Sequence, residues 1–261
     1  MNSSAGKSVD FTGDTEVPGT LVSREAASMA VSRYEVARRL ATGRRVLEIA
    51  CGSGQGLGYV ARSAARIVGG DITFGLLSRA RAHYRSAVPL VHFDAHALPF
   101  LTGTFDVIQL HEAIYYMRSP EDVFHECQRV LSPDGVLIVS SINPAWRDFN
   151  PSVRASAYLR AEDLQRMLGR AFRVVDIRFG FAAPVDAPRT IMISAVKRAA
   201  VRLRLIPRTM RGKTLLKRVF LGPLMPVPSE LTPDIAPIDE PRSVPLAEAT
   251  RYRIIYAVAH R

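Results

Sequence analysis

A glycine-rich loop between an apolar strand-like run and a helical pattern constrains this chain more than any other feature. Residues 46–58 read VLEIACGSGQGLG, with glycine at positions 52, 54, 56 and 58. A glycine has no Cβ, so its backbone can approach a ligand closely. The N–H groups at the start of the following helix attract electron-rich groups. The segment therefore predicts a binding loop for a nucleotide-type cofactor.

The spacing of these glycines does not fit a nicotinamide or flavin dinucleotide. That fingerprint reads G-x-G-x-x-G, and its last glycine falls on Leu57 when counted from Gly52, or on Tyr59 when counted from Gly54. The chain instead places Glu48 four residues before Gly52, in the pattern E-x-x-x-G-x-G-x-G. The loop therefore predicts a different cofactor class.

A second acid follows at a distance that suits a nucleoside. The short strand-like run 67–72 contains Asp71, 19 residues after Gly52. A carboxylate about 20 residues after such a loop can accept hydrogen bonds from the ribose hydroxyls. An Asp at a strand end is also a common turn residue, so the assignment depends on its register with the loop.

Strand-like and helix-like segments alternate along the chain. The expected strands after residue 46 are 67–72, 90–95, 105–112, 136–141, 172–178 and 251–260. Helical spacing covers 23–40 and 120–131, and Ser-Pro-Asp-Gly at 132–135 predicts a turn. Such alternation indicates an α/β fold, a mostly parallel sheet with helices on both faces. Ligands of such sheets bind at the carboxyl ends of the strands, where Glu48, Asp71, Asp94 and Glu112 fall.

These motifs together resemble the class I S-adenosylmethionine-dependent methyltransferases. Besides the glycine motif, RVLSPDG at 129–135 is similar to the family's R-V-L-x-P-G-G. FTGDTEVPG at 11–19 is similar to an F-T-G-E-R-x-x-P-G opening of the small-molecule, type 11-like branch associated with sugar, glycan or specialised-metabolite biosynthesis. The resemblance implies S-adenosyl-L-methionine as cofactor and a doubly wound, Rossmann-like seven-stranded sheet. Its last strand would run antiparallel and insert between the fifth and sixth strands.

The resemblance also implies a set of cofactor-binding residues. They are Glu48, Ala50, Gly52, Ser53, Gly54, Asp71, Ile72, Asp94, Ala95, His111 and Glu112. In the family the Asp94 position faces the adenine amino group, and the backbone N–H of the next residue meets a ring nitrogen. Glu48 would hold the loop and the methionine amino group, or would be a buried acid paired with loop N–H groups. Arg33 and Tyr34 could reach the cofactor carboxylate, although an ordinary surface Arg fits Arg33 equally well.

The acceptor side of the predicted site is defined by fewer residues. His111 ends the fourth expected strand and is the candidate catalytic residue, as a general base or a positioning group. The alternative is a packed histidine that contacts cofactor or backbone. Tyr115 and Tyr116 would line the acceptor side, since similar E-x-x-Y-Y-x segments occur in the family.

Composition divides the chain into a core and appended parts. We expect a flexible N-terminal segment or lid over 1–22, the cofactor-binding core over 23–181, a basic and proline-rich cap over 182–250, and the last core strand over 251–261. Seven prolines lie between 222 and 245, at positions 223, 226, 228, 233, 237, 241 and 245. This density excludes regular helix or central strand and predicts an extended strap or a mobile lid.

Positive charge is concentrated in one part of the cap. The chain has 35 Lys and Arg against 24 Asp and Glu, a net charge of +11, and nine of the basic residues lie in 197–218 without an acid. Interleaved apolar residues give this stretch an amphipathic helical pattern. It could contact an anionic membrane surface or an acidic substrate, or form a solvated helix face. The stretch has no aromatic residues for base stacking, so nucleic acid is disfavoured.

Other sequence features limit the compartment and the chemistry. Two cysteines occur without metal-ligand spacing, so we expect no metal site. No apolar run approaches the ~20 residues of a membrane span, and no secretory signal is evident, which predicts a cytoplasmic location. The expected function is methylation of a small-molecule acceptor, foremost O-methylation of a sugar, glycan precursor or specialised metabolite. Two alternatives stay open, a lipid or lipid-linked acceptor at a membrane and a non-catalytic cofactor-binding partner. The sequence leaves the oligomeric state open.

Overall fold

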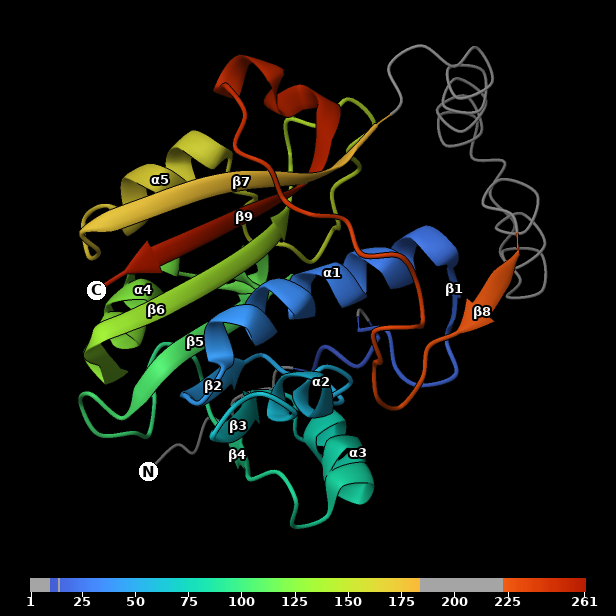
Figure 1. Ribbon diagram of the computed structural model, residues 1–261, viewed down its shortest axis with the longest axis vertical. Helices are drawn as coiled ribbons and strands as arrows, with labels where there is room; N and C mark the ends of the chain where they lie inside the picture. Colours follow the sequence, from blue (N-terminus) through green and yellow to red (C-terminus); the bar gives the residue numbers. More distant parts are fainter. Residues whose placement is uncertain (1–9, 14, 184–222) are drawn as a thin grey trace, which may run out of the picture.

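A seven-stranded sheet forms the centre of the protein. The computed structural model describes residues 10–13, 15–183 and 223–261. The strands are β2 (Arg45–Ile49), β3 (Arg66–Asp71), β4 (Leu90–His92), β5 (Phe105–His111), β6 (Leu131–Ile142), β7 (Val174–Ala182) and β9 (Tyr252–His260). Their order in the sheet is β4-β3-β2-β5-β6-β9-β7 (Figure 1). The last strand β9 runs antiparallel to both β6 and β7, between which it lies. The predicted Rossmann-like fold is therefore confirmed.

The strand order reverses between β2 and β5. From β2 the chain passes outward through β3 to β4, and it then returns to β5 on the other side of β2. All pairings among these four strands and β6 are parallel. In open parallel sheets, ligands bind outside the carboxyl ends of the strands at such a reversal. The topology thus locates the expected site at the ends of β2 and β5.

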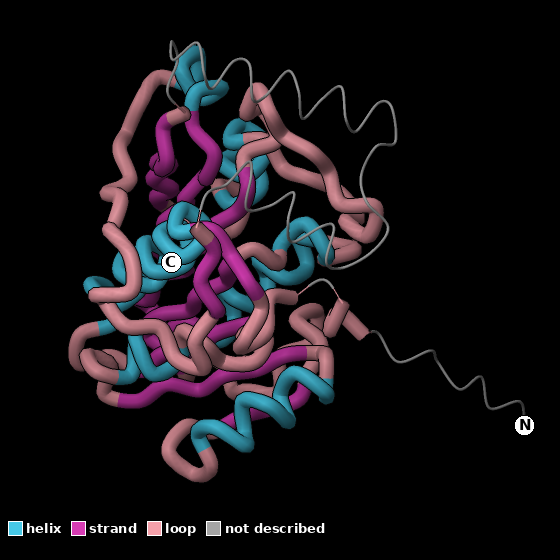
Figure 2. Tube along the Cα trace, turned by 90° about the vertical axis from the view of Figure 1, so that its right-hand side faces the viewer, coloured by secondary structure: helices cyan, strands magenta, loops and turns pink. Residues whose placement is uncertain are grey.

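Helices cover both faces of the sheet, as Figures 1 and 2 show. One face carries α1 (Arg24–Ala41), α2 (Leu57–Ala61) and α3 (Phe74–Tyr84), and the other carries α4 (Pro120–Val130) and α5 (Ala161–Leu168). Two short 3-10 helices, η1 (Ile114–Tyr116) and η2 (Leu246–Arg251), complete the described helices. Helix α1 begins at Ser23, whose side chain accepts a hydrogen bond from the Ala26 N–H at 3.1 Å. This N-cap satisfies one of the free donors of the first turn.

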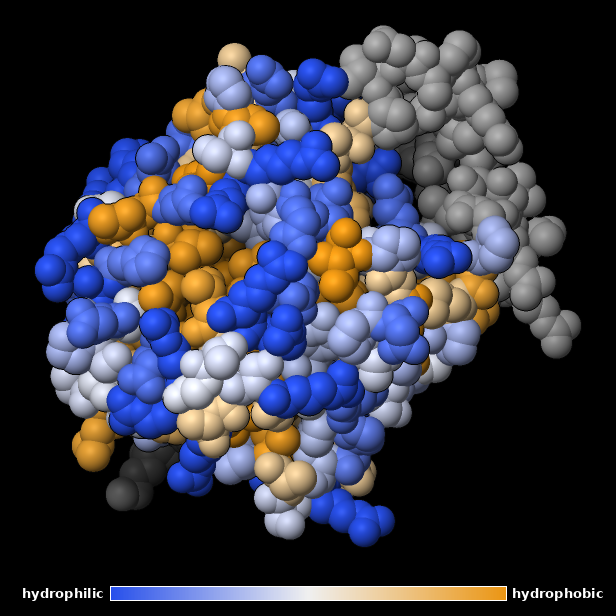
Figure 3. Space-filling view, viewed as in Figure 1, coloured by the Kyte–Doolittle hydropathy of each residue, from blue (hydrophilic) through white to orange (hydrophobic). Residues whose placement is uncertain are grey.

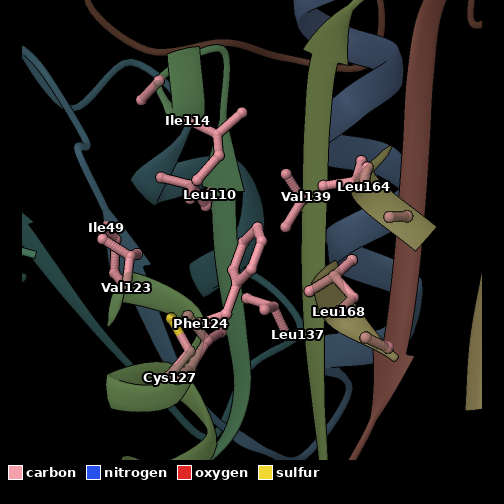
Figure 4. Packing of buried hydrophobic residues seen from close by; sticks show 14 of the residues in the cluster. Ile49, Leu110, Ile114, Val123, Phe124, Cys127, Leu137, Val139, Leu164 and Leu168 are labelled. Atoms are coloured by element: carbon pink, nitrogen blue, oxygen red, sulfur yellow. The ribbon is translucent and has the colours of Figure 1, made fainter. Parts of the chain in front are cut away.

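The central strands bury apolar side chains on both faces. Val46, Val107, Val136 and Ile138 belong to the cluster beneath α1, α2 and α3. Their neighbours Leu47, Ile49, Ile108, Leu110, Leu137 and Val139 pack on the opposite face with Val123, Phe124, Cys127, Leu164 and Leu168 of α4 and α5 (Figure 4). Successive residues of a strand point to opposite faces. Strands buried on both faces therefore read as nearly continuous apolar runs, which is why they were recognisable in the sequence.

The expected turn at 132–135 lies inside strand β6. The strand starts at Leu131, which pairs with Phe105, and its register shifts before Val107 pairs with Val136. A Cβ on Gly135 would lie 2.8 Å from the Ser132 carbonyl oxygen. Leu131 already pairs with β5, so the strand begins before the turn residues. These residues then interrupt the regular β5–β6 pairing between Leu131 and Val136. The expected strand 90–95 is also shorter, since β4 ends at His92.

The proline-rich segment forms a strap across α1 (Figure 1). Its first part, β8 (Leu224–Pro226), pairs antiparallel with β1 (Leu21–Ser23) in a separate two-stranded ribbon. Further along, the Asp239 N–H donates to Ser32 Oγ at 2.8 Å, and Glu240 pairs with Arg39 of α1. The prolines suit this position, because a two-stranded edge ribbon does not need every N–H group.

Parts of the predicted cap lie outside the described residues, including the basic stretch 197–218.

On the face viewed in Figure 1, apolar side chains are visible over β6 and β9 between charged residues (Figure 3). No helix among the described residues is long and apolar enough to cross a membrane.

Candidate functional site

A cavity of about 780 Å³ opens at the carboxyl ends of β2 and β5. Its wall includes the glycine loop, the ends of β3 and β5, the loop after β4, helix α1, the strap, and Phe11, Thr15 and Glu16 of the N-terminal segment. Sites for small molecules and cofactors measure about 300–1,000 Å³. The cavity therefore lies where the strand order reverses and has the volume of a ligand site.

The glycine loop is held by a side chain from the next strand. The Gly52 N–H donates to Asp71 Oδ2 at 2.8 Å, and the Thr73 N–H donates to Asp71 Oδ1 at 2.7 Å. Gly52 has φ +58° and Gly54 has φ +81°. Both angles lie in the left-handed region that favours glycine. The loop conformation thus depends on these two glycines and on the Asp71 carboxylate.

Tyr84 supports the same loop from behind. Its hydroxyl donates to the Gly54 carbonyl oxygen at 2.8 Å and accepts from the Gly58 N–H at 2.9 Å. A Cβ on Gly54 would lie 3.1 Å from the Tyr84 ring. This tyrosine was not identified from the sequence, because it ends helix α3 and no local pattern links it to the loop.

Asp71 and Ile72, which the sequence suggested as cofactor-binding residues, contribute to the cavity wall. Asp71 is 6% exposed, and burial raises the pKa of its carboxyl group. Each carboxylate oxygen accepts one backbone hydrogen bond and keeps a second lone pair. The carboxylate can therefore accept hydrogen bonds from two vicinal hydroxyls of a ligand.

Asp94 and Ala95 also line the cavity. Burial raises the pKa of Asp94, but hydrogen bonds from His96 lower it more, so the net shift is downward. His96 contributes its backbone N–H at 3.0 Å and its Nδ1 at 2.6 Å from Asp94 Oδ1. Since both contacts involve Oδ1, Oδ2 can accept a hydrogen bond from a ligand amino group.

Glu48 lies behind the loop, and no part of it belongs to the cavity wall. It is 1% exposed, accepts from the Tyr34 hydroxyl at 2.7 Å and accepts from Gln109 Nε2 at 2.9 Å. Burial is the main reason why its pKa is raised to about 7. The structure thus brings Glu48 together with two side chains rather than with the loop N–H groups. Ser53 and Gly54 likewise do not line the cavity.

His111 contributes to the wall and is almost fully buried. Its Nδ1 lies 2.8 Å from Ser140 Oγ, and its ring packs edge-on against Tyr34 with centroids 5.0 Å apart. Burial, assisted by the charge of Arg33, lowers the pKa of His111 to about 3. The imidazole is therefore neutral at physiological pH and a weak proton acceptor. This favours a positioning role over that of a general base.

Glu112 and Arg33 face each other across the cavity wall. Arg33 Nη2 lies 3.8 Å from Glu112 Oε1, and the Tyr115 hydroxyl donates to Glu112 Oε2 at 3.2 Å. Both side chains are about one-fifth exposed. Arg33 is therefore part of the site rather than an ordinary surface residue.

Tyr115 and Tyr116 lie on the wall within an aromatic cluster. Tyr115 stacks on Tyr158 with centroids 4.8 Å apart, and Tyr116 packs against Phe11 at 5.0 Å. The guanidinium group of Arg154 lies over the Phe11 ring at 5.5 Å. Aromatic faces and an arginine therefore converge on one side of the cavity.

The N-terminal segment and the strap close the cavity from outside. Gln55 Nε2 donates to the Glu16 carbonyl oxygen at 2.6 Å, and the Phe11 N–H donates to Thr73 Oγ1 at 3.3 Å. Strap residues Met225, Pro226, Val227, Pro228 and Leu231 add an apolar wall. The sequence indicated a covering segment but not these wall residues, because their position depends on pairing between β1 and β8.

No group of three or more His, Cys, Asp or Glu residues within the described parts of the chain could hold a metal ion.

Comparison with known proteins identifies the central part of the chain. Residues 47–139 match the methyltransferase domain family. This methyltransferase domain contains the glycine loop, Asp71, Asp94, His111 and Glu112, and it ends within β6.

Two relatives that are O-methyltransferases share this region. The chain is 31% identical over 133 residues to a malonyl-[acyl-carrier protein] O-methyltransferase of Legionella pneumophila, covering 46% of this chain and 47% of the relative. It is 30% identical over 141 residues to a ubiquinone biosynthesis O-methyltransferase of Xanthomonas oryzae, covering 52% and 57%. The chain thus matches only about half the length of these relatives.

Solved structures extend the likeness to nearly the whole fold. A S-adenosylmethionine-dependent methyltransferase of Thermotoga maritima has a TM-score of 0.56 at 13% identity, covering 89% of each chain. At this identity the likeness concerns the fold alone. The family match and the relatives together support a class I S-adenosylmethionine-dependent methyltransferase with S-adenosylmethionine as its cofactor.

The residues of the methyltransferase domain fit this cofactor. A Cβ on Gly52 would lie 3.3 Å from Thr15 Cγ2, so Thr15 packs closely against the backbone of the glycine loop. Asp71 has acceptor capacity for two ribose hydroxyls, and Asp94 has it for an amino group. The largely buried Arg33 guanidinium supplies hydrogen-bond donors near the end of β5. His111 Nε2, which has no hydrogen-bond partner among the described residues, supplies a further polar atom there.

Proposed function

We propose that this chain is a S-adenosylmethionine-dependent methyltransferase that methylates an oxygen of a small molecule. The observation that carries the proposal is the cavity between β2 and β5, where Asp71 holds the glycine loop and Glu112 faces Arg33. Sugars, glycan precursors and specialised metabolites, which carry many hydroxyl groups, are the acceptors that we favour.

The cavity wall suits an acceptor of mixed character. Strand β1, the start of α1 and the strap offer apolar contacts, namely Val22, Ala26, Ala27, Met225, Val227 and Leu231. The same wall also presents the polar groups of Arg33, Glu112, Tyr115 and Arg154. In pockets lined largely by apolar side chains, a few placed polar groups fix the orientation of the ligand. The volume leaves room for a cofactor and a small acceptor together.

The activities of both relatives support transfer to oxygen. One is a malonyl-[acyl-carrier protein] O-methyltransferase and the other a ubiquinone biosynthesis O-methyltransferase. These activities belong to the relatives, of which this chain matches about half the length. They nevertheless favour an oxygen acceptor over a nitrogen or carbon acceptor.

The chain's own residues would act mainly by positioning. Bound S-adenosylmethionine supplies an electrophilic methyl group on a sulfonium that is a good leaving group. Asp71 and the glycine loop would fix the nucleoside, and Asp94 would orient the adenine. Phe11, Thr15, Glu16 and the strap would exclude water. Tyr115 and Tyr116 would hold the acceptor in line with the methyl group.

Methylation of a lipid-linked acceptor at a membrane is the second proposal carried over from the sequence. It depends on 197–218, which lies outside the described residues. We therefore rank it below a small-molecule acceptor. The third candidate function is a protein that binds the cofactor without catalysis. The Glu112 carboxylate on the cavity wall counts against it, because its Oε1 has no hydrogen-bond partner among the described residues.

Transfer of a radiolabelled methyl group tests the proposal. The protein would be incubated with labelled S-adenosylmethionine and a small-molecule extract of its source, which is then split into aqueous and organic phases. We expect label in the aqueous phase, lost in Asp71→Asn and kept in the surface control Asp163→Asn. Label only in the organic phase would support a lipid-linked acceptor. Binding of cofactor without label in either phase would contradict an enzyme for small molecules.

A further inference from the structure

The backbone of Glu112 has an unusual conformation. Its φ is +51°, in the left-handed region, where a residue with a Cβ is strained by about 1–2 kcal/mol. The Glu112 N–H donates to the Ser140 carbonyl oxygen at 2.8 Å, which continues the β5–β6 ladder past the end of β5. Such strain often marks a residue whose side-chain direction matters for function. Here the strained residue directs a carboxyl group to the cavity wall.

The Glu112 carboxyl group has fewer hydrogen bonds than a buried carboxylate requires. Among the described residues, Oε1 is buried and has no hydrogen-bond partner. Oε2 accepts from the Tyr115 hydroxyl at 3.2 Å, and the backbone N–H of Ile142 also faces the carboxylate. A carboxylate offers about four lone-pair sites, and a buried polar group without partners is costly. The group therefore has spare capacity to accept a hydrogen bond from a ligand.

Charged and titratable groups face this carboxyl group from several elements. Arg33 of α1 lies at 3.8 Å, and its charge favours the ionised form, while burial raises the pKa of Glu112. Tyr115 of η1 and the Ile142 N–H of β6 also favour ionisation, whereas Glu16 opposes it. The buried Tyr256 hydroxyl of β9 interacts with the same arginine and carboxylate. The net shift is upward, so the carboxylate is a stronger base than an exposed one.

His111 differs from Glu112 in the direction of its pKa shift and in its hydrogen bonding. Its pKa is lowered to about 3, and its Nδ1 is occupied by Ser140. A proton placed on this imidazole would lie in a buried site that already contains the Arg33 charge. A proton placed on Glu112 neutralises a buried charge instead. Electrostatics therefore favour Glu112 as the proton acceptor.

We propose that Glu112 is the catalytic base that removes the proton from an acceptor hydroxyl, and this inference rests on the proposed function. The acceptor O–H bond breaks and its proton passes to the Glu112 carboxylate. The electron pair of the oxygen forms the bond to the methyl carbon. The C–S bond breaks, and its electron pair stays on sulfur as a neutral thioether. Atoms and charge balance, because the sulfonium charge disappears as the carboxylate charge is neutralised.

The same arrangement selects against a positively charged acceptor. Arg33 balances the charge of Glu112 within 3.8 Å, and the cofactor brings a sulfonium. An ammonium group would meet two positive charges and one negative charge, whereas a neutral hydroxyl needs only a hydrogen-bond acceptor. The inferred substrate class is therefore a neutral alcohol or phenol.

The test compares Glu112→Gln and Glu112→Asp with wild-type protein. The acceptor is the extract fraction that wild-type protein labels, and the readouts are transfer rate between pH 5 and 9, S-adenosylhomocysteine affinity and thermal midpoint. We expect Glu112→Gln to lower the rate at least 100-fold and to remove the decline in rate at low pH. Glu112→Asp should restore part of the rate with a shifted pH profile. Affinity for S-adenosylhomocysteine should change less than threefold in both variants.

Each other outcome has a definite meaning. Glu121→Gln, which removes an exposed partner of Arg170, is the control and should match wild-type protein.

A Glu112→Gln variant with wild-type rate and pH profile would overturn the inference while leaving the proposed function intact. Loss of S-adenosylhomocysteine affinity equal to the loss of rate would overturn it too, because Glu112 would then bind cofactor. If Glu112→Gln does not fold, an unchanged pH profile in Glu112→Asp overturns it. No labelling by wild-type protein overturns the proposed function and this inference with it.

Discussion

Asp71 Oδ2 accepts the Gly52 backbone N–H at 2.8 Å and so ties the end of β3 to the glycine loop after β2. The same carboxylate accepts the Thr73 N–H through Oδ1 and lines the cavity. One side chain therefore shapes the loop and offers acceptor atoms to a ligand. This double role explains why an acid 19 residues after Gly52 was the most informative partner of the glycine motif.

Asp71→Asn should weaken cofactor binding about 10- to 100-fold. An amide keeps the shape but loses one acceptor and the charge, and hydrogen bonds to charged groups contribute about 1.5–3 kcal/mol. Calorimetric titration with S-adenosylhomocysteine measures the change. Asp163→Asn, which alters an exposed pair with Arg166 on α5, is the matched control. Equal affinity in Asp71→Asn and wild-type protein would remove Asp71 from the cofactor site.

Tyr84→Phe should lower the free energy of unfolding by about 2 kcal/mol. The change leaves the Gly58 N–H and the Gly54 carbonyl oxygen without the hydroxyl that bridges them. Each buried group left unsatisfied costs about 1–3 kcal/mol. Urea unfolding measures the loss. A variant as stable as wild-type protein would mean that water replaces the hydroxyl without penalty.

Glu48 should make stability depend on pH between about 4.5 and 7. Burial raises its pKa in the folded state to about 7, above the value of 4.5 for an exposed glutamate. The folded state therefore holds this proton more tightly, and its contribution to stability is complete below pH 4.5 and lost as pH rises to about 7. The size is about 3 kcal/mol at most, from 1.36 kcal/mol for each pKa unit.

Glu48→Gln removes this ionisation and is the measurement of choice. The difference in unfolding free energy between Glu48→Gln and wild-type protein should change across pH 4.5–7 and be constant above it. A constant difference over the whole range would show that Glu48 ionises normally in the folded state.

His111 should stay neutral across the physiological range. Burial and the nearby Arg33 lower its pKa to about 3. In an NMR titration of wild-type protein, assigned by comparison with His111→Asn, its ring resonance should not shift between pH 5 and 8. A titration near pH 6.5 would restore His111 as a candidate base and weaken the case for Glu112.

Local sequence patterns were sufficient for the fold and for placing Gly52, Asp71 and Asp94 at one edge of the sheet. The strands are buried on both faces, so their apolar runs were visible without knowledge of their neighbours. The positions of Gly52, Asp71 and Asp94 were predictable because each lies at the end of a strand or within three residues after it, and carboxyl ends of parallel strands meet at one edge of the sheet.

The environments of Glu48, His111 and Glu112 depend on contacts between distant segments. Glu48 pairs in register with Gln109 of β5 and accepts a hydrogen bond from Tyr34 of α1. Neither partner could be inferred from the spacing of the motif. The low pKa of His111 depends on Arg33, which is 78 positions away in the chain. The positive φ of Glu112 likewise had no sequence signal, because glutamate does not favour that region.

The apolar wall of the cavity was the least predictable part. Met225 and Leu231 lie in the proline-rich segment, which has no helical or alternating apolar pattern. Met225 is positioned by the pairing of β8 with β1, and Leu231 by a hydrogen bond from its N–H to the Gln55 carbonyl oxygen. Prolines indicated an extended strap but not the helix that it crosses. Acceptor identity depends on this wall, so it follows least from the sequence.

Calorimetric titration of wild-type protein with S-adenosylhomocysteine tests the central claim most directly. The cavity at the ends of β2 and β5 should bind one molecule per chain, with heat that is lost or strongly reduced in Asp71→Asn and retained in Asp163→Asn. Absence of binding by folded wild-type protein, or equal binding by Asp71→Asn, would contradict a S-adenosylmethionine site at the glycine loop.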